Sequence, residues 1–166
     1  MVKSGDKVAG VFNSFFVNKI QCLKQKLDTK EEISPTKNIN SLTSSFSFQL
    51  VSTAQVEKII SKMKTSTSCG IDGISSKILK ITKNEVGPAI SYLVNSSLQG
   101  GYIPQIFKTA KISPIFKSKG DKSNKSNYRP VSGLSTIGKI IEIAANIQIT
   151  RYCERFGIFG QHQHGF

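Results

Sequence analysis

The sequence has no long hydrophobic run. No apolar stretch approaches the roughly 18–20 residues that a membrane-spanning helix needs, and Asp6, Lys7, Asn13 and Asn18 interrupt the first twenty residues. The same stretch lacks the apolar core and the small-residue cleavage site of a secretory signal. We therefore expect an intracellular protein, cytoplasmic or nuclear, with no membrane partner.

Cysteine is scarce and scattered. Cys22, Cys69 and Cys153 are odd in number and far apart in sequence, which argues against a disulfide framework. We expect three reduced side chains in the core or half-buried. No Gly-X-Ser-X-Gly elbow, phosphate-binding glycine loop or redox cysteine pair is present, so the common nucleophilic and redox motifs are missing.

Acidic residues are few, and they are dispersed. Two-metal phosphoryl chemistry needs carboxylates held together on a rigid frame, but only Glu31 and Glu32 are adjacent, in a probable linker. Asp72 lies in a Gly-Ile-Asp-Gly turn and is expected to make an Asx-type turn contact. His162 and His164 lack a nearby cysteine pair to complete a zinc site. The sequence therefore predicts no metal site and no catalytic carboxylate.

Positive charge dominates the composition. The 166 residues contain 23 Lys and Arg against 10 Asp and Glu, a formal net charge of +13. Such an excess points to a polyanionic partner, either nucleic acid or an anionic membrane surface. The length suits about one domain, and a hydrophobic fraction of 38% suits one modest core.

The spacing of apolar residues predicts a mostly helical chain. Residues 6–27 show steps of three and four, typical of an amphipathic helix that must dock on something. Residues 29–47 are rich in Ser, Thr and Asn and contain Pro35, so they are expected to form a linker. Ser52 and Gln55 have capping-box spacing at the start of a second helix. Further helices are predicted at residues 74–81, 86–98 and 135–156.

A different pattern follows Pro104. Residues 110–116 and 128–131 are short and rich in apolar residues, and each contains a proline, which confines a strand to an edge or a bulge. A long polar segment with Gly120 separates them, so we expect a two-stranded ribbon with a mobile basic tip. The predicted fold class is α+β, mostly helical with a small antiparallel β-ribbon.

This ribbon concentrates the positive charge. One acid accompanies seven basic residues, which are Lys108, Lys111, Lys117, Lys119, Lys122, Lys125 and Arg129. One interpretation is a solvated, disordered basic loop. The other is a phosphate-binding surface, because an arginine held in a strand next to Tyr128 offers a planar fork and a ribbon lysine offers a point charge. Together they could grip a triphosphate or a nucleic-acid backbone.

The order of several short motifs resembles the reverse transcriptases of non-LTR (LINE-type) retrotransposons. The motifs are SCGIDGI at 68–74, GYIP at 101–104, FKTAKISPIFK at 107–117, GD at 120–121, NYRPVS at 127–132, LS at 134–135, KI at 139–140, Glu142, and QHGF at 163–166. The match covers about residues 46–166, and residues 11–27 are similar to the helix that precedes the polymerase in such proteins. We therefore divide the chain into a helix with a polar linker, residues 1–45, and a polymerase-like part, residues 46–166.

The resemblance implies that residues 46–166 form the fingers and the start of the palm. It also implies that Lys117 and Arg129 hold the triphosphate of the incoming nucleotide. Lys108, Lys111, Lys119, Lys122 and Lys125 would then lie near template or nucleotide phosphates. The implied partners are an RNA template, a DNA primer and a deoxynucleoside triphosphate, with Mg²⁺ as the cofactor of the complete polymerase and no cofactor in this chain.

In that family the first catalytic Asp follows the QHGF segment, so we expect the chain alone to lack polymerase activity, with the rest of the palm and the thumb missing. Residues 143–150 are less basic than the family pattern, which is compatible with an inactive relic. Two alternatives remain open at this stage. One is a non-catalytic, basic nucleic-acid-binding module. The other is an interaction protein whose first helix docks on a partner.

Overall fold

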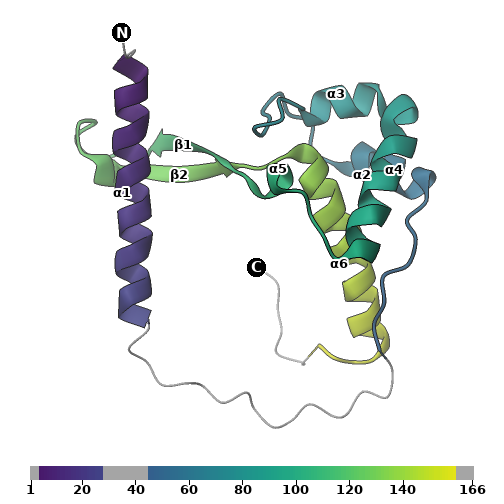
Figure 1. The fold of residues 1–166 in the computed structure, drawn as a ribbon. Helices are drawn as coiled ribbons and strands as arrows, with labels where there is room; N and C mark the ends of the chain where they lie inside the picture. Colours follow the sequence, from purple (N-terminus) through teal and green to yellow (C-terminus); the bar gives the residue numbers. More distant parts are fainter. Residues whose placement is uncertain (1–3, 28–44, 160–166) are drawn as a thin grey trace. The chain divides into compact units, whose positions relative to one another are not determined.

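The computed structural model describes residues 4–27 and 45–159. Its elements (Figure 1) are α1 (Ser4–Leu27), α2 (Thr53–Lys62), α3 (Ser76–Ile81), α4 (Lys83–Gly100), α5 (Gln105–Lys108), β1 (Lys111–Phe116), the 3-10 turn η1 (Lys125–Asn127), β2 (Tyr128–Gly133) and α6 (Thr136–Arg155). Helices dominate, and β1 and β2 form one antiparallel sheet, which confirms the predicted α+β class. No helix within the described ranges is long and apolar enough to cross a membrane.

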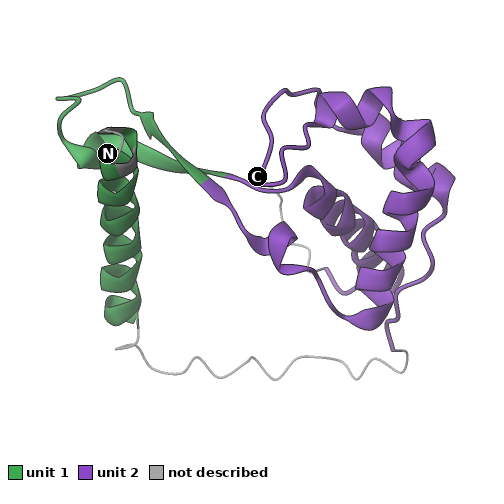
Figure 2. Cartoon of the chain, turned by 45° about the horizontal axis from the view of Figure 1, so that its top comes forward, with its two compact units in different colours: residues 1–42, 112–132 green, residues 43–111, 133–166 purple. Residues whose placement is uncertain are grey.

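The chain divides into two compact units (Figure 2). The first unit combines residues 1–42 with 112–132, and the second combines 43–111 with 133–166. The first therefore holds α1 and most of the ribbon, and the second holds the other helices. Most of the expected linker lies outside the described residues, and the division at residue 45 stays a prediction.

Helix α2 begins where the sequence predicts it. The Gln55 N–H donates to Ser52 Oγ at 3.3 Å, and the Ser52 N–H donates to Gln55 Oε1 at 2.8 Å. These reciprocal bonds satisfy two backbone donors that the first helical turn would otherwise leave unpaired. The cap fixes the residue at which α2 begins. From there Val56, Ile59 and Ile60 fall on one side of the helix, and all three are buried.

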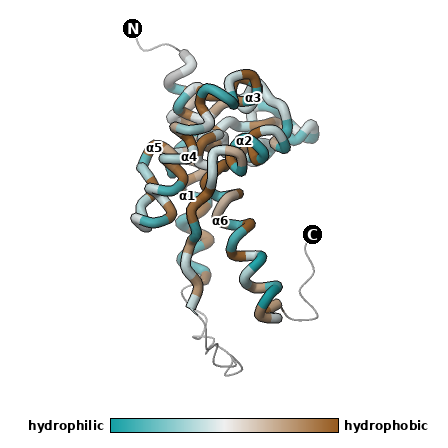
Figure 3. The backbone as a smooth tube through the Cα atoms, turned by 90° about the vertical axis from the view of Figure 1, so that its right-hand side faces the viewer, coloured by the Kyte–Doolittle hydropathy of each residue, from teal (hydrophilic) through white to brown (hydrophobic). Residues whose placement is uncertain are grey.

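The core of the second unit lies where α2, α4 and α6 pack together. Val94 of α4 and Ile140 and Ile141 of α6 join the α2 stripe and are almost completely buried. Burying each of these side chains contributes about 1.5–3 kcal/mol. Hydrophobic and hydrophilic residues are interspersed along α6 in Figure 3, and Ile140, Ile141 and Ala144 are its buried apolar residues. Gly101 caps the C-terminal end of α4, and its φ of 61° suits glycine.

Polar contacts that the sequence did not predict fix the segment before α2. The Val51 carbonyl accepts hydrogen bonds from Ser91 Oγ at 2.8 Å and Asn95 Nδ2 at 3.0 Å, and the Val51 N–H donates to Asn95 Oδ1 at 2.8 Å. Both partners belong to α4. They supply the hydrogen bonds that a buried, non-helical backbone needs.

The turn at residues 70–73 holds the start of α6. Asp72 Oδ1 accepts from the Ile74 N–H at 3.2 Å, which confirms the expected Asx turn. Asp72 Oδ2 accepts from Ser135 Oγ at 2.5 Å, and that same hydroxyl oxygen accepts from the Gly138 N–H at 3.2 Å. Ser135 is therefore both the N-cap of α6 and the link to the turn. This part of the SCGIDGI motif is structural.

Gly70 allows this close approach, because a Cβ built there would lie 2.7 Å from the Ser135 nitrogen and 2.9 Å from the Leu134 oxygen. Both are backbone atoms that cannot rotate away. We expect Gly70→Ala to lower the free energy of unfolding by about 1–3 kcal/mol, measured by urea denaturation.

Gly100→Ala is the matched control, since its Cβ would meet nothing within 4 Å. Its effect is expected to stay within about 0.5 kcal/mol. Equal stability of the two variants would contradict the close packing at Gly70.

Candidate functional site

One face of the ribbon packs on α1 through aromatic rings. The Phe116 and Tyr128 ring centroids are 5.4 Å apart, and Phe12 of α1 meets Tyr128 edge-on at 4.8 Å. Phe16 stacks with Phe12 at 5.8 Å and is 8% exposed. We call Phe12, Phe15, Phe16, Phe116 and Tyr128 the aromatic cluster. The N-terminal helix thus docks within the first unit through these rings, whereas Ile20, Leu23 and Leu27 of α1 stay exposed.

The opposite face of the ribbon is exposed. Successive side chains of a strand point to opposite faces, so the neighbours of Phe116 and Tyr128 point away from α1. These neighbours include Ile115, Lys117 and Arg129, and Val131 points the same way because it lies two residues after Arg129. We call these four residues the open face. All four are exposed, Ile115 by 50% and Val131 by 49%. Strand alternation therefore places the two strongest site candidates, Lys117 and Arg129, on one surface.

Backbone contacts fix the direction of Lys117. Its N–H donates to the Asn127 carbonyl at 2.8 Å, which extends the ladder one step beyond β1. Its ammonium donates to the Ser126 carbonyl at 2.8 Å. The Ser126 carbonyl therefore holds the Lys117 ammonium next to the β1–β2 hydrogen bonds, while the side chain stays exposed to solvent.

Arg129 takes its position from its neighbours in β2. Tyr128 on one side is committed to the aromatic cluster, and Pro130 on the other has a restricted φ. The guanidinium is exposed and always charged, and its planar fork can make paired hydrogen bonds to phosphate oxygens. The Lys117 ammonium and the Arg129 guanidinium lie on one face, which suits the binding of an anion with several oxygens.

The tip between the strands is a hydrogen-bonded turn, and its predicted mobility stays a prediction. The Asp121 carbonyl accepts from Asn127 Nδ2 at 2.8 Å, and its carboxylate accepts from the Ser123 N–H at 2.9 Å and the Ser123 hydroxyl at 2.7 Å. Tyr128 Oη donates to the Lys122 carbonyl at 3.0 Å. Gly120, with φ of 86°, permits the reversal of the chain.

This turn separates the lysines of the tip. The Lys122 ammonium lies 5.9 Å from the Phe116 ring centroid, and that of Lys125 lies 5.7 Å from the Phe15 ring centroid. Both rings belong to the aromatic cluster, so these two charges gather on the α1 side and not on the open face. Lys119 is exposed within the tip.

The remaining two basic candidates belong to the second unit. The Lys108 ammonium lies 5.8 Å from the Tyr102 ring centroid, and Lys111 is exposed at the start of β1. The roles of all seven basic residues stay predictions.

The cysteines are more exposed than the sequence suggested. All three are free, but Cys22 and Cys69 are exposed and only Cys153 is half-buried. The expectation of core or half-buried positions was wrong for the first two. Cys22 lies in the last third of α1, and Cys69 directly precedes the tightly packed Gly70.

Carboxylates do not converge in the described part of the chain. No group of three or more His, Cys, Asp or Glu side chains there could hold a metal ion. Asp72 and Asp121 already bind neighbouring hydroxyl and amide groups. The pairs Glu31–Glu32 and His162–His164, and the QHGF segment, lie outside the described residues. The described carboxylates do not form a two-Mg²⁺ centre, and the expectation about Mg²⁺ stays a prediction.

Comparison with known proteins relates the chain to one class of polymerase. It is 30% identical over 124 residues to the RNA-directed DNA polymerase from mobile element jockey of Drosophila funebris, covering 69% of this chain and 13% of that protein. It is 29% identical over 112 residues to a probable RNA-directed DNA polymerase from transposon X-element of Drosophila melanogaster, covering 68% and 12%.

The chain is similar to RNA-directed DNA polymerases of non-LTR retrotransposons. A putative 115 kDa protein in the type-1 retrotransposable element R1DM of Drosophila melanogaster also matches, at 27% identity over 89 residues, 53% of this chain and 9% of that protein. No family model matches the chain. The predicted resemblance to LINE-type retrotransposons is confirmed, and the chain spans only 13% of the jockey protein of Drosophila funebris.

Sequence reasoning missed the apolar part of the open face. Ile115 and Val131 lie in phase with Lys117 and Arg129 and add an apolar border to the charges. The signal was present, because Tyr128 could have been assigned to the buried side and its neighbours to the other by alternation alone.

The carboxyl of Asp121 yields a testable pH dependence. Hydrogen bonds from the Ser123 N–H and then the Ser123 hydroxyl hold its pKa below the ordinary value of 3.8. A lowered folded pKa means that the turn gains stability above pH 3.8 and loses it as the pH falls through the folded pKa. Carbon-detected NMR titration should place the Asp121 midpoint below 3.8.

Ser123→Ala removes only the hydroxyl donor, so the midpoint should rise part of the way towards the ordinary value. A midpoint at or above 3.8 in the unaltered chain would show that the tip turn is not formed in solution.

Proposed function

We propose that this chain forms the fingers and the start of the palm of a reverse transcriptase, and that its open face binds the triphosphate of the incoming deoxynucleotide. The observation that carries the proposal is the position of Lys117 and Arg129 on one exposed face of a ribbon whose other face packs on α1. The relatives, named as RNA-directed DNA polymerases, support the same function.

The chemistry of the two side chains suits a triphosphate. Arg129 would make paired hydrogen bonds to oxygens of one phosphate group, and Lys117 would contribute a point charge to the next. Ile115 and Val131 would border these contacts and limit the access of water. The role of this surface is to bind and orient the nucleotide, and RNA template and DNA primer are the proposed further partners.

Mg²⁺ would stabilise the attacking and leaving oxygens in the complete polymerase. The described carboxylates do not form a site for it. We therefore assign no step to the metal in this chain, and the proposed role is nucleotide binding without catalysis.

Nucleotide binding is tested with residues 1–166 and a dye-labelled deoxynucleoside triphosphate, measured by fluorescence anisotropy. The double variant Lys117→Ala and Arg129→Ala removes both charges from the open face. We expect its affinity to fall about tenfold, since two partly exposed ionic contacts together contribute about 1–2 kcal/mol.

The matched control is Lys122→Ala with Lys125→Ala. It removes the same net charge from the side of the aromatic cluster, so only the general electrostatic attraction falls, by about twofold. Circular dichroism checks that both proteins fold. Equal losses in the two double variants would contradict a specific site, because only net charge would then matter.

The excess of positive charge favours one alternative, a non-catalytic nucleic-acid-binding module. Labelled RNA and a labelled deoxynucleoside monophosphate separate the two functions. Triphosphate binding that exceeds monophosphate binding and needs the open face supports the nucleotide site. Salt-sensitive RNA binding with no triphosphate binding would support the module instead.

A further inference from the structure

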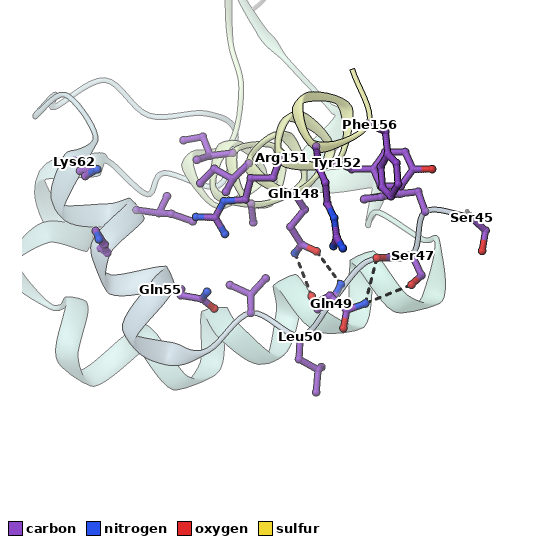
Figure 4. Close-up of a pocket in the computed structure, with 18 of the residues that line it drawn as sticks. Ser45, Ser47, Gln49, Leu50, Gln55, Lys62, Gln148, Arg151, Tyr152 and Phe156 are labelled. Carbon is purple, nitrogen blue, oxygen red and sulfur yellow. Dashed lines mark hydrogen bonds between the residues drawn. The ribbon is translucent and has the colours of Figure 1, made fainter. Parts of the chain in front are cut away.

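A large groove crosses the second unit between α2 and α6. Its volume is about 1000 Å³, and the segment before α2 forms its third side (Figure 4). Val51, Ile59 and Met63 line one part of it, and Ile143 and Ile147 line another. The apolar lining needs a partner that can bury hydrophobic side chains. This groove shares no residue with the open face, so its ligand does not depend on the proposed nucleotide site.

Four cations border the groove. Lys58 and Lys62 stand on α2, and Arg151 and Arg155 stand on α6, and all four are exposed. In each pair the residues are four apart, so they lie about one helical turn from each other on the same side of their helix. No carboxylate is among the described residues that line the groove. The groove therefore has two basic edges around an apolar floor.

This pattern is complementary to one kind of partner. We propose that the groove binds an acidic amphipathic helix of a partner protein, with an apolar stripe on the floor and carboxylates along both flanks. Helices bound in grooves use such a stripe at helical spacing, and carboxylates one turn apart would face the cation pairs on both walls. A second copy of this chain is a poor occupant, since its own net charge is +13.

The groove is less suited to a nucleic-acid strand. Single strands bind where aromatic rings offer free faces and where polar groups are available. Here the aromatic rings at one end of the groove pack on each other. The ring centroid of Tyr152 lies 5.3 Å from that of Phe46 and 4.7 Å from that of Phe156. The Gln148 amide is also engaged, accepting from the Gln49 N–H at 2.7 Å and donating to its carbonyl at 3.1 Å. The aliphatic floor would remain without a partner under a strand of phosphates.

The test uses the full 166-residue chain. The probe is a dye-labelled synthetic peptide of about 18 residues, with leucines along one stripe and glutamates on both flanks. Fluorescence anisotropy should show binding that a scrambled peptide of equal composition lacks. Lys58→Glu with Lys62→Glu, and Arg151→Glu with Arg155→Glu, should each weaken it about tenfold or more.

Lys77→Glu with Lys139→Glu is the matched control, because both lysines are exposed in the same unit but do not line the groove. It should change affinity by about twofold at most. A peptide with lysine in place of the flanking glutamates should bind the variant in which all four groove cations are reversed, which restores complementarity and shows that this variant is folded.

Three results would overturn the proposal. The first is binding of the scrambled peptide as tight as that of the amphipathic one, and the second is equal weakening by the control variant. The third is single-stranded RNA that binds through the four groove cations while the acidic peptide does not bind. That last result would assign the groove to nucleic acid.

Discussion

The commitment of one ribbon face to aromatic packing is the constraint on which the candidate site depends. Tyr128 contacts both Phe12 of α1 and Phe116 of the neighbouring strand. These contacts fix which face of the β1–β2 ribbon packs on α1. Because side chains alternate along a strand, the burial of these rings exposes Lys117 and Arg129 together. An aromatic contact on one side therefore positions the charges on the other.

Much of the fold could be predicted from local sequence. The capping box of Ser52 and Gln55, the glycine after α4 and the closely spaced isoleucines of α6 are each a signal that spans only a few residues. The contacts of Val51 with α4 and of Asp72 with Ser135 were not predictable in this way. They join residues that are 40, 44 and 63 positions apart, and a side chain gives no local sign of so distant a partner.

The candidate site was predictable only in part. The resemblance to retrotransposon polymerases singled out Lys117 and Arg129, and strand alternation explains why they share a face. The separation of Lys122 and Lys125 from them was not predictable from charge. It follows from the turn held by Asp121 and Asn127, which brings both lysines to the rings on the α1 side. A run of like charges thus divides into two surfaces with different neighbours.

The most direct test of the central claim is an amide NMR titration of the chain with an unlabelled deoxynucleoside triphosphate. The account predicts shift changes concentrated on residues 115, 117, 129 and 131, with small changes at residues 122 and 125. Changes centred on the α1 side, or spread evenly over the exposed lysines, would contradict it. In that case the charge of the ribbon would attract anions without forming a nucleotide site.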